Sequence, residues 1–170
     1  MAIRTATLRN LARQPAYGSE RYGSLYEAKA AAAKTAFLCH SHHDGEIVRG
    51  LIAYFKKIGW NVYVDWMDVT MPEAPNRETA EKIQTKINQT DYFLFLATKN
   101  SMTSRWCPWE VGYADGVQKR DKILIIPTEE GGIYYGNEYL QLYRCIDEAM
   151  DGGLGVWNVN ETTGIYLNSL

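Results

Sequence analysis

A chain of 170 residues, 46% of them hydrophobic, is long enough to bury one globular core without staples such as disulfides. The formal net charge of −2 excludes the strongly basic surface typical of nucleic-acid or anionic-membrane binding, and we expect neither partner. The three cysteines (Cys39, Cys107 and Cys145) are widely spaced and odd in number, which predicts reduced thiols in a cytoplasmic protein.

The first 34 residues are expected to form an N-terminal helical appendage. A short helix is followed by the helix-breaking residues Gly18, Gly23 and Ser24, and then by an alanine-rich helix over residues 25–34. The segment is rich in arginine and poor in acidic residues, which weakly resembles an organelle transit peptide. A short N-terminal helix that docks on the domain explains the same residues, and we prefer that interpretation.

Residues 35–150 alternate short apolar runs with helical patterns and are expected to form the main domain. Buried strands are predicted at residues 36–39, 61–65, 92–97 and 122–127. Helical spacing of apolar residues predicts helices over residues 47–58, 80–87 and 139–150. This alternation is typical of an α/β fold with a mostly parallel, doubly wound sheet. Residues 151–170 are expected to form a glycine-rich extension with a hairpin that turns at residues 161–164.

Three polar segments follow predicted strands, at residues 40–44, 65–76 and 98–110. In open α/β sheets, ligands bind beyond the carboxyl ends of the strands, so we expect these segments to meet at one edge. The second segment begins with two carboxylates and an indole, Asp65, Trp66 and Asp68, which fit a ligand site and a polar loop equally well.

The third segment contains the most informative run in the chain, because Trp106 and Trp109 lie within four residues of Glu110. Indole rings are costly to leave in water, and a carboxyl group beside apolar rings keeps its proton or holds a cationic ligand. The run is therefore typical of a pocket wall. In the alternative interpretation, both tryptophans anchor the core and Glu110 is a solvated residue in the first turn of a helix.

Other chemistries find less support in the sequence. All three histidines lie at residues 40–43, but only Cys39 and Asp44 are local candidates for further ligands, so no metal is expected. A nucleophilic pair of Cys107 and His40 stays open as a less favoured alternative. Neither GxGxxG nor GxxxxGK[ST] occurs, so any nucleotide would be held without a glycine-rich phosphate loop.

Three motifs together resemble the TIR (Toll/interleukin-1 receptor-like) domain in its bacterial form. They are F-L-C-H-S-H-H-D at residues 37–44, G-W-N-V-Y-V-D at 59–65 and S-R-W-C-P-W-E at 104–110, and the similarity extends from Thr35 to Ile146. The resemblance implies a flavodoxin-like three-layer α/β fold. Cys39 stands where the family usually has serine, and Pro72 and Pro75 stand in a loop where it often has glycine.

Some members of this family consume NAD⁺, and the resemblance implies cleavage of the nicotinamide–ribose bond. Glu110 matches the position of their catalytic glutamate, Trp106 would support its loop, and Trp109 would stack on the substrate. The remaining residues expected to contact substrate are His40, Ser41, Asp65 and Trp66. NAD⁺ would be the substrate, so no separate cofactor is expected. The product would be ADP-ribose, a cyclic isomer or a conjugate.

The resemblance also implies partners. TIR domains associate with one another, and bacterial members of this size often make a nucleotide signal for a separate effector protein in Thoeris-type anti-phage defence. Two alternatives remain at this point. One is a non-catalytic TIR adaptor that acts by assembly, and the other is an N-glycosidase similar to nucleoside deoxyribosyltransferases.

Overall fold

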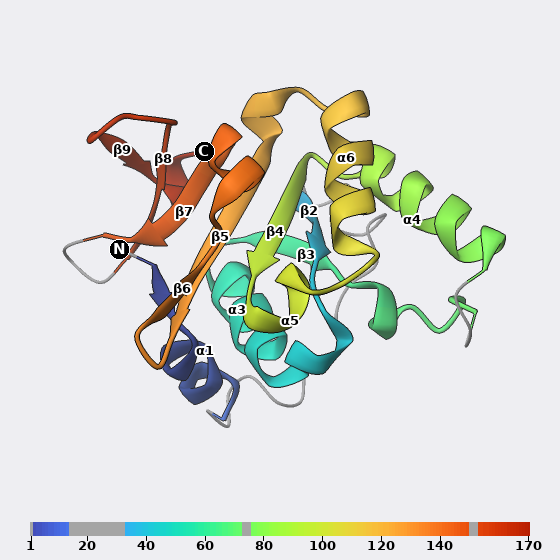
Figure 1. Ribbon diagram of the computed structural model, residues 1–170, viewed down its shortest axis with the longest axis horizontal. Coiled ribbons are helices and arrows are strands. Elements are labelled where there is room, and N and C mark those ends of the chain that lie inside the picture. The colour runs from blue at the N-terminus through green and yellow to red at the C-terminus, as the bar shows by residue number, and fades with distance from the viewer. Residues whose placement is uncertain (1, 14–32, 73–75, 150–152) are drawn as a thin grey trace.

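The computed structural model describes residues 2–13, 33–72, 76–149 and 153–170. Its central sheet follows the order β3-β2-β4-β5-β7-β8-β9, and β1 and β6 also pair with β5 (Figure 1). Neighbouring strands from β3 to β7 are parallel, whereas β8 and β9 are antiparallel to their neighbours. The strands are β1 Ile3–Arg4, β2 Lys34–Cys39, β3 Trp60–Tyr63, β4 Tyr92–Ala97, β5 Ile123–Glu130, β6 Ile133–Tyr135, β7 Arg144–Glu148, β8 Leu154–Trp157 and β9 Gly164–Tyr166.

Helices cover both faces of this sheet and make a three-layer α/β fold (Figure 1). The helices α1 and α3 pack on one face, and α4 and α6 pack on the other. Their bounds are α1 Thr5–Ala12, α3 Gly45–Lys57, α4 Arg77–Gln89, α5 Lys99–Met102 and α6 Cys107–Val117. Short 3₁₀ turns connect several elements, at His42–Asp44, Asp65–Met67, Arg120–Lys122, Glu138–Leu142 and Leu167–Ser169.

The sheet separates two hydrophobic cores. Strand β2 shows the principle, because Ala36 and Leu38 face the core under α3 while Phe37 and Cys39 face the core under α4 and α6. Successive side chains of a strand point to opposite faces, so a strand between two helical layers must be apolar throughout. The predicted central strands are confirmed for this reason, with small differences at their ends.

The N-terminal segment contributes to the sheet and to one core. Strand β1 pairs in parallel with β5, with Ile3 opposite Thr128, and Leu8 of α1 is buried against α3. Arg9 of α1 forms ion pairs with Glu46 and Glu130. The alanine-rich helix expected over residues 25–34 lies almost wholly outside the described residues, and Lys34 already belongs to β2.

Close packing of α1 on α3 requires a glycine at position 50. A Cβ atom on Gly50 would lie 1.8 Å from the carbonyl oxygen of Leu8, and backbone cannot move aside as a flexible side chain can. We expect Gly50→Ala to destabilise the protein by about 1–3 kcal/mol or more, measured by urea unfolding. Gly116→Ala on α6 is the control, because open space surrounds that position and alanine favours helix by up to ~1 kcal/mol. Equal stability of Gly50→Ala and wild type would contradict the packing.

The helix predicted over residues 139–150 is wrong. This segment contains the 3₁₀ turn Glu138–Leu142 and then β7, which pairs in parallel with β5 and antiparallel with β8. Leu140, Tyr143 and Ile146 are buried at intervals of three residues, and this spacing resembles one face of a helix. Because β5 offers an unpaired edge here, strand pairing prevails over the local pattern.

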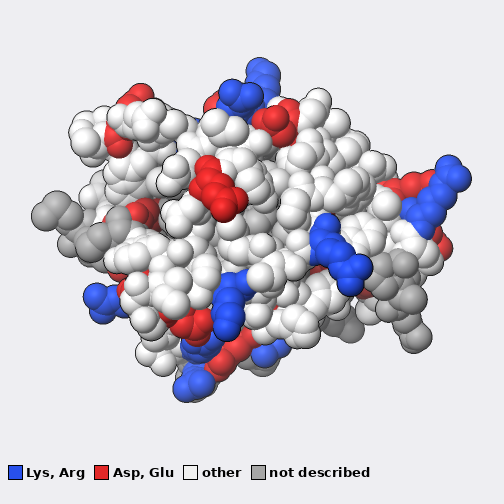
Figure 2. All heavy atoms as spheres, viewed as in Figure 1, with Lys and Arg blue, Asp and Glu red and all other residues white. Residues whose placement is uncertain are grey.

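The C-terminal residues 153–170 also pack on the domain. Strands β8 and β9 form an antiparallel hairpin, with Trp157 opposite Gly164, and Leu167 is buried in the core under α3. The face shown in Figure 2 consists mostly of uncharged residues, with acidic and basic side chains scattered over it. Within the described residues, the helices are all too short or too polar to cross a membrane.

Candidate active site

A cavity of about 370 Å³ opens at the carboxyl ends of β2 and β3 and at the start of α6. It gathers residues from all three polar segments that the sequence placed at this edge. The lining residues are His40, Ser41, His42, His43, Asp65, Thr79, Ile83, Asn100, Thr103, Ser104, Trp106 and Glu110. Five of the seven residues predicted for the site are therefore brought together, and two are not.

Glu110 contributes a buried carboxyl group to the cavity wall. It lies in the first turn of α6, whose start is set by Pro108 and by Ser104, which accepts hydrogen bonds from the backbone N–H groups of Trp106 and Cys107. Only 6% of the residue is exposed. Burial, reinforced by Cys107 and Asp65, raises the pKa of Glu110 to about 8, although a hydrogen bond with Cys39 opposes the shift. Glu110 is therefore mostly protonated at neutral pH in the free protein.

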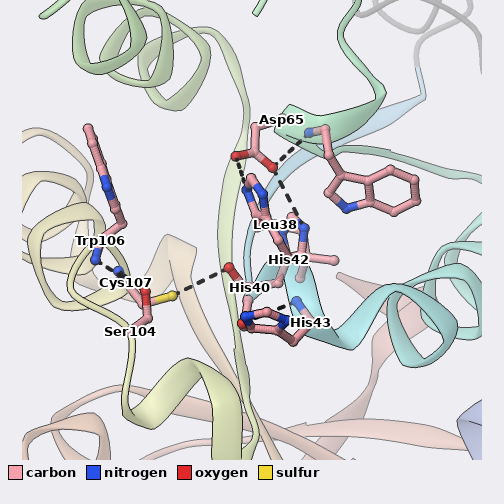
Figure 3. A network of polar contacts seen from close by, with 10 residues as sticks. Leu38, His40, His42, His43, Asp65, Ser104, Trp106 and Cys107 are labelled. Carbon is pink, nitrogen blue, oxygen red and sulfur yellow. Dashed lines mark hydrogen bonds and ion pairs between the residues drawn. The ribbon is translucent and has the colours of Figure 1, made fainter. Parts of the chain in front are cut away.

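His40 contributes a buried imidazole to the wall of the same cavity. Its Nδ1 lies 2.8 Å from the carbonyl oxygen of Leu38, which can only accept, so Nδ1 carries the proton (Figure 3). Burial lowers the pKa of His40, so the ring is neutral and Nε2 keeps a lone pair. Within the described residues, Nε2 has no hydrogen-bond partner.

Asp65 lies between His40 and His42 (Figure 3). Its Oδ2 is 3.0 Å from Nε2 of His42, and its Oδ1 is 3.6 Å from Nε2 of His40. Burial alone would raise the pKa of Asp65, but the hydrogen bond with His42 and the two nearby imidazoles outweigh it and lower that pKa. The bond to Asp65 raises the pKa of His42 in return. The cavity therefore has an ionised carboxylate beside a neutral imidazole.

Asp44 ties two loops of the site together. Its carboxylate accepts hydrogen bonds from Thr98 Oγ1 at 2.5 Å and from Asn100 Nδ2 at 2.6 Å, both of which follow β4. Asn100 lines the cavity, and its amide is oriented by this contact. We did not predict Asn100 as a site residue, because its partner Asp44 is 56 residues away and sequence spacing gives no signal for the pair.

The tryptophans differ in their relation to the cavity. Trp106 lines the cavity. Its ring packs edge to face against the ring of Trp109, with 5.4 Å between the ring centroids. Trp109 stacks on Tyr113 with a centroid distance of 6.2 Å and lies outside the lining. Trp66 also lies outside it, with its ring edge-on to His40 at 6.3 Å. Both outer tryptophans are 37% exposed, so neither is a core anchor.

The catalytic pair of Cys107 and His40 is not formed in this structure. The sulfur of Cys107 lies 3.4 Å from the backbone carbonyl oxygen of His40, while the imidazole is bonded to Leu38 (Figure 3). A base that activates a thiol must contact the sulfur itself. Across the residues that the structure describes, no group of three or more His, Cys, Asp or Glu side chains is arranged to hold a metal ion.

The part of the sequence that forms this fold and contains the cavity matches a known family. A family model of the TIR domain matches residues 36–147, so the chain belongs to the TIR domain family and the expected flavodoxin-like fold is confirmed. The match begins in β2, ends in β7 and includes every residue that lines the cavity.

Two relatives carry names that refer to one type of product. Over 113 residues, 65% of the chain, the sequence is 34% identical to a Bacillus cereus (strain MSX-D12) protein named as a probable 3′ cyclic ADP-D-ribose synthase, ThsB′. Over 81 residues, 46% of the chain, it is 28% identical to a Cytobacillus dafuensis protein named, also provisionally, as the cyclic ADP-D-ribose synthase TIR2. The matched segments span 58% and 21% of these two relatives.

Proposed function

We propose that this protein cleaves the nicotinamide–ribose bond of NAD⁺ and closes the ADP-ribose part into a cyclic product. The observation that carries the proposal is the buried carboxyl group of Glu110 in the wall of a TIR-domain cavity. The names of the two relatives support a cyclic ADP-ribose as the product. In this proposal Glu110 is the catalytic residue.

The chemistry suits a single carboxylate. Nicotinamide leaves a positively charged pyridinium as a neutral molecule, so no acid has to protonate it. The ribose then carries positive charge in a transition state that resembles an oxocarbenium ion. When the cationic ring enters the cavity, its charge favours the ionised form of Glu110 and lowers the pKa of that group. The carboxylate then faces the developing charge from a fixed position.

Other lining residues fit the polar parts of such a substrate. The partly exposed carboxylate of Asp65, backed by the buried neutral imidazole of His40, is an acceptor for ribose hydroxyl groups. Ser41 and the oriented amide of Asn100 supply further polar contacts. Because Glu110 is almost fully buried, the reacting carbon would be shielded from water, which favours attack by a group of the same substrate over hydrolysis.

We further propose that the product acts as a signal in anti-phage defence, read by a separate effector protein, and that copies of the chain associate through their TIR domains. The name ThsB′ of the first relative and the family membership support this role.

The proposal is tested by incubating the purified protein with NAD⁺, with and without extract from phage-infected cells. Chromatography follows nicotinamide release, and mass spectrometry distinguishes ADP-ribose from a cyclic product that is lighter by one water. We expect stoichiometric nicotinamide and the lighter product. Turnover of deoxynucleosides but not of NAD⁺ would favour the deoxyribosyltransferase alternative. Failure to release nicotinamide under every condition would favour the adaptor.

A further inference from the structure

His42 contributes an exposed imidazole to the candidate active site. It lies in the 3₁₀ turn His42–Asp44, which follows β2, and it lines the cavity with 68% of its side chain accessible. Its Nε2 is 3.0 Å from Oδ2 of Asp65, and its ring stacks on that of His40 with 6.0 Å between the centroids (Figure 3). These two contacts orient the ring while most of the side chain stays accessible.

The bond to Asp65 determines which nitrogen of His42 can take up a proton. Asp65 is ionised, so its oxygens can only accept hydrogen bonds, and Nε2 carries the proton of the neutral ring. The lone pair is then on Nδ1, which has no hydrogen-bond partner within the described residues. The carboxylate also stabilises the cation that forms when Nδ1 takes up a second proton. His42 and Asp65 therefore have the arrangement of a histidine base supported by a carboxylate.

The proposed reaction releases a proton, and the inference drawn from this arrangement rests on that proposed function. When nicotinamide leaves, it takes the electron pair of its bond to the ribose carbon C1″. A hydroxyl group of the second ribose can then bond to C1″ through its oxygen, and the hydroxyl proton must go to an acceptor. The products are nicotinamide, the cyclic nucleotide and one proton. Because the reacting carbon is shielded from water in this proposal, the first acceptor has to be a side chain.

The other titratable groups of the cavity wall suit this role less well than His42 does. The Nε2 atom of His40 is completely buried. The pKa of Asp65 is lowered, so its carboxylate is a weak base. The carboxylate of Glu110 is engaged by the positive charge of the ribose in the proposed mechanism. The imidazole of His43 has no carboxylate partner within the described residues.

We propose that His42 is a second catalytic residue, which accepts the proton of the attacking ribose hydroxyl group at Nδ1 while Asp65 holds the ring in place. Because the His42 side chain is exposed, it can then pass the proton to solvent. In this division of labour, Glu110 serves the departure of nicotinamide and His42 serves the closure of the ring.

The variant His42→Gln tests this inference through the products of NAD⁺ turnover. Glutamine can still donate an N–H group to Asp65, but it accepts no proton at neutral pH. Chromatography gives the ratio of cyclic product to ADP-ribose within one reaction, so a change in overall rate does not affect it. We expect this ratio to fall at least about tenfold, because a positioned general base accelerates its step by about 10²–10⁴-fold. Hydrolysis should be affected less, since attacking water can pass its proton to other water molecules.

The matched control is His43→Gln. It removes the neighbouring imidazole, which is also exposed and also lines the cavity but lacks a carboxylate partner within the described residues. This variant should keep the wild-type ratio. Both histidines are exposed, so both variants should fold.

Nuclear magnetic resonance of the imidazole nitrogens examines the base without NAD⁺. At a pH where the His42 ring is neutral, its proton should be on Nε2, and the spectrum of His42→Gln identifies its signals. Asp65→Asn should lower the pKa of His42, because the bond to the carboxylate raises it. The other titratable groups of the cavity wall, His40, His43 and Glu110, are the same in both proteins.

The outcomes separate this inference from the proposed function. Absence of nicotinamide release from wild type would reject the proposed function, and the inference with it. Nicotinamide release with only ADP-ribose as the second product, an unchanged ratio in His42→Gln, or an equal fall in His43→Gln would overturn the inference alone. A raised KM for NAD⁺ at an unchanged ratio would mean that His42 only binds the substrate. A proton on Nδ1 of the neutral His42 ring would also overturn the inference, whatever the products.

Discussion

Replacing Glu110 by glutamine is expected to reduce nicotinamide release from NAD⁺ by about 10²–10³-fold, the usual effect of removing one electrostatic contact to a transition state. Glutamine has nearly the same shape as glutamic acid but cannot ionise. It therefore fills the same buried place in the first turn of α6 without offering negative charge to the ribose. The rate is measured by chromatography of nicotinamide at saturating NAD⁺.

The control for this experiment is Glu78→Gln. Glu78 lies in the first turn of α4, pairs with Lys82 on the surface and does not line the cavity. Its replacement should leave the rate unchanged, which excludes a general effect of losing one negative charge. Turnover of Glu110→Gln within twofold of wild type would show that another group stabilises the transition state.

The same Glu110→Gln variant is expected to become more stable than wild type as the pH rises above about 5. Glu110 has an ordinary pKa of 4.5, which its folded environment raises to about 8. Between these values the unfolded chain gives up the proton and the folded chain keeps it, so wild type loses stability as the pH rises. Each pKa unit corresponds to about 1.4 kcal/mol, so the advantage of the glutamine variant should reach roughly 4 kcal/mol near pH 7.5.

Urea unfolding of both proteins at a series of pH values measures this advantage. The two free energies of unfolding should coincide near pH 4.5, separate as the pH rises, and run parallel above about pH 8.5. A difference that does not change with pH would mean that Glu110 ionises normally in the folded protein. The activity and stability results together identify Glu110 as a residue placed at a cost in stability for its chemistry.

Local sequence patterns predicted the parts of the fold that depend on burial from two sides. Strands β2 and β4 lie in the middle of the sheet, so nearly every one of their residues is buried and the apolar runs are continuous. Prediction failed at residues 144–148, where Ile146 is fully buried but its neighbours Arg144 and Cys145 are only partly so. This strand exists because β5 and β8 pair with it, and pairing between distant segments leaves no regular trace in a short window.

The sequence predicted which segments of the chain meet at the site, because the direction of the strands determines where their ends lie. Parallel strands end at the same edge, so residues that directly follow them meet, as His40 and Asp65 do. The orientation of the Trp66 and Trp109 side chains was not predictable. Trp66 directly follows Asp65 and Trp109 directly precedes Glu110, but neither tryptophan lines the cavity. The roles of Asp44 and Asn100 depend on a contact across 56 residues, which only the folded chain reveals. Pro75, one of the two prolines that stand where the family often has glycine, lies outside the described residues.

Burial of Glu110 also bears on the redox state of a bound dinucleotide. In the proposed reaction, the oxidised nicotinamide ring brings a positive charge that favours ionisation of the buried carboxyl group. The reduced ring is neutral, so it would leave Glu110 protonated and gain no attraction from it. Near neutral pH, a carboxyl group that is mostly protonated until a cation binds would therefore let the cavity distinguish NAD⁺ from NADH by charge, although the two molecules have similar shapes.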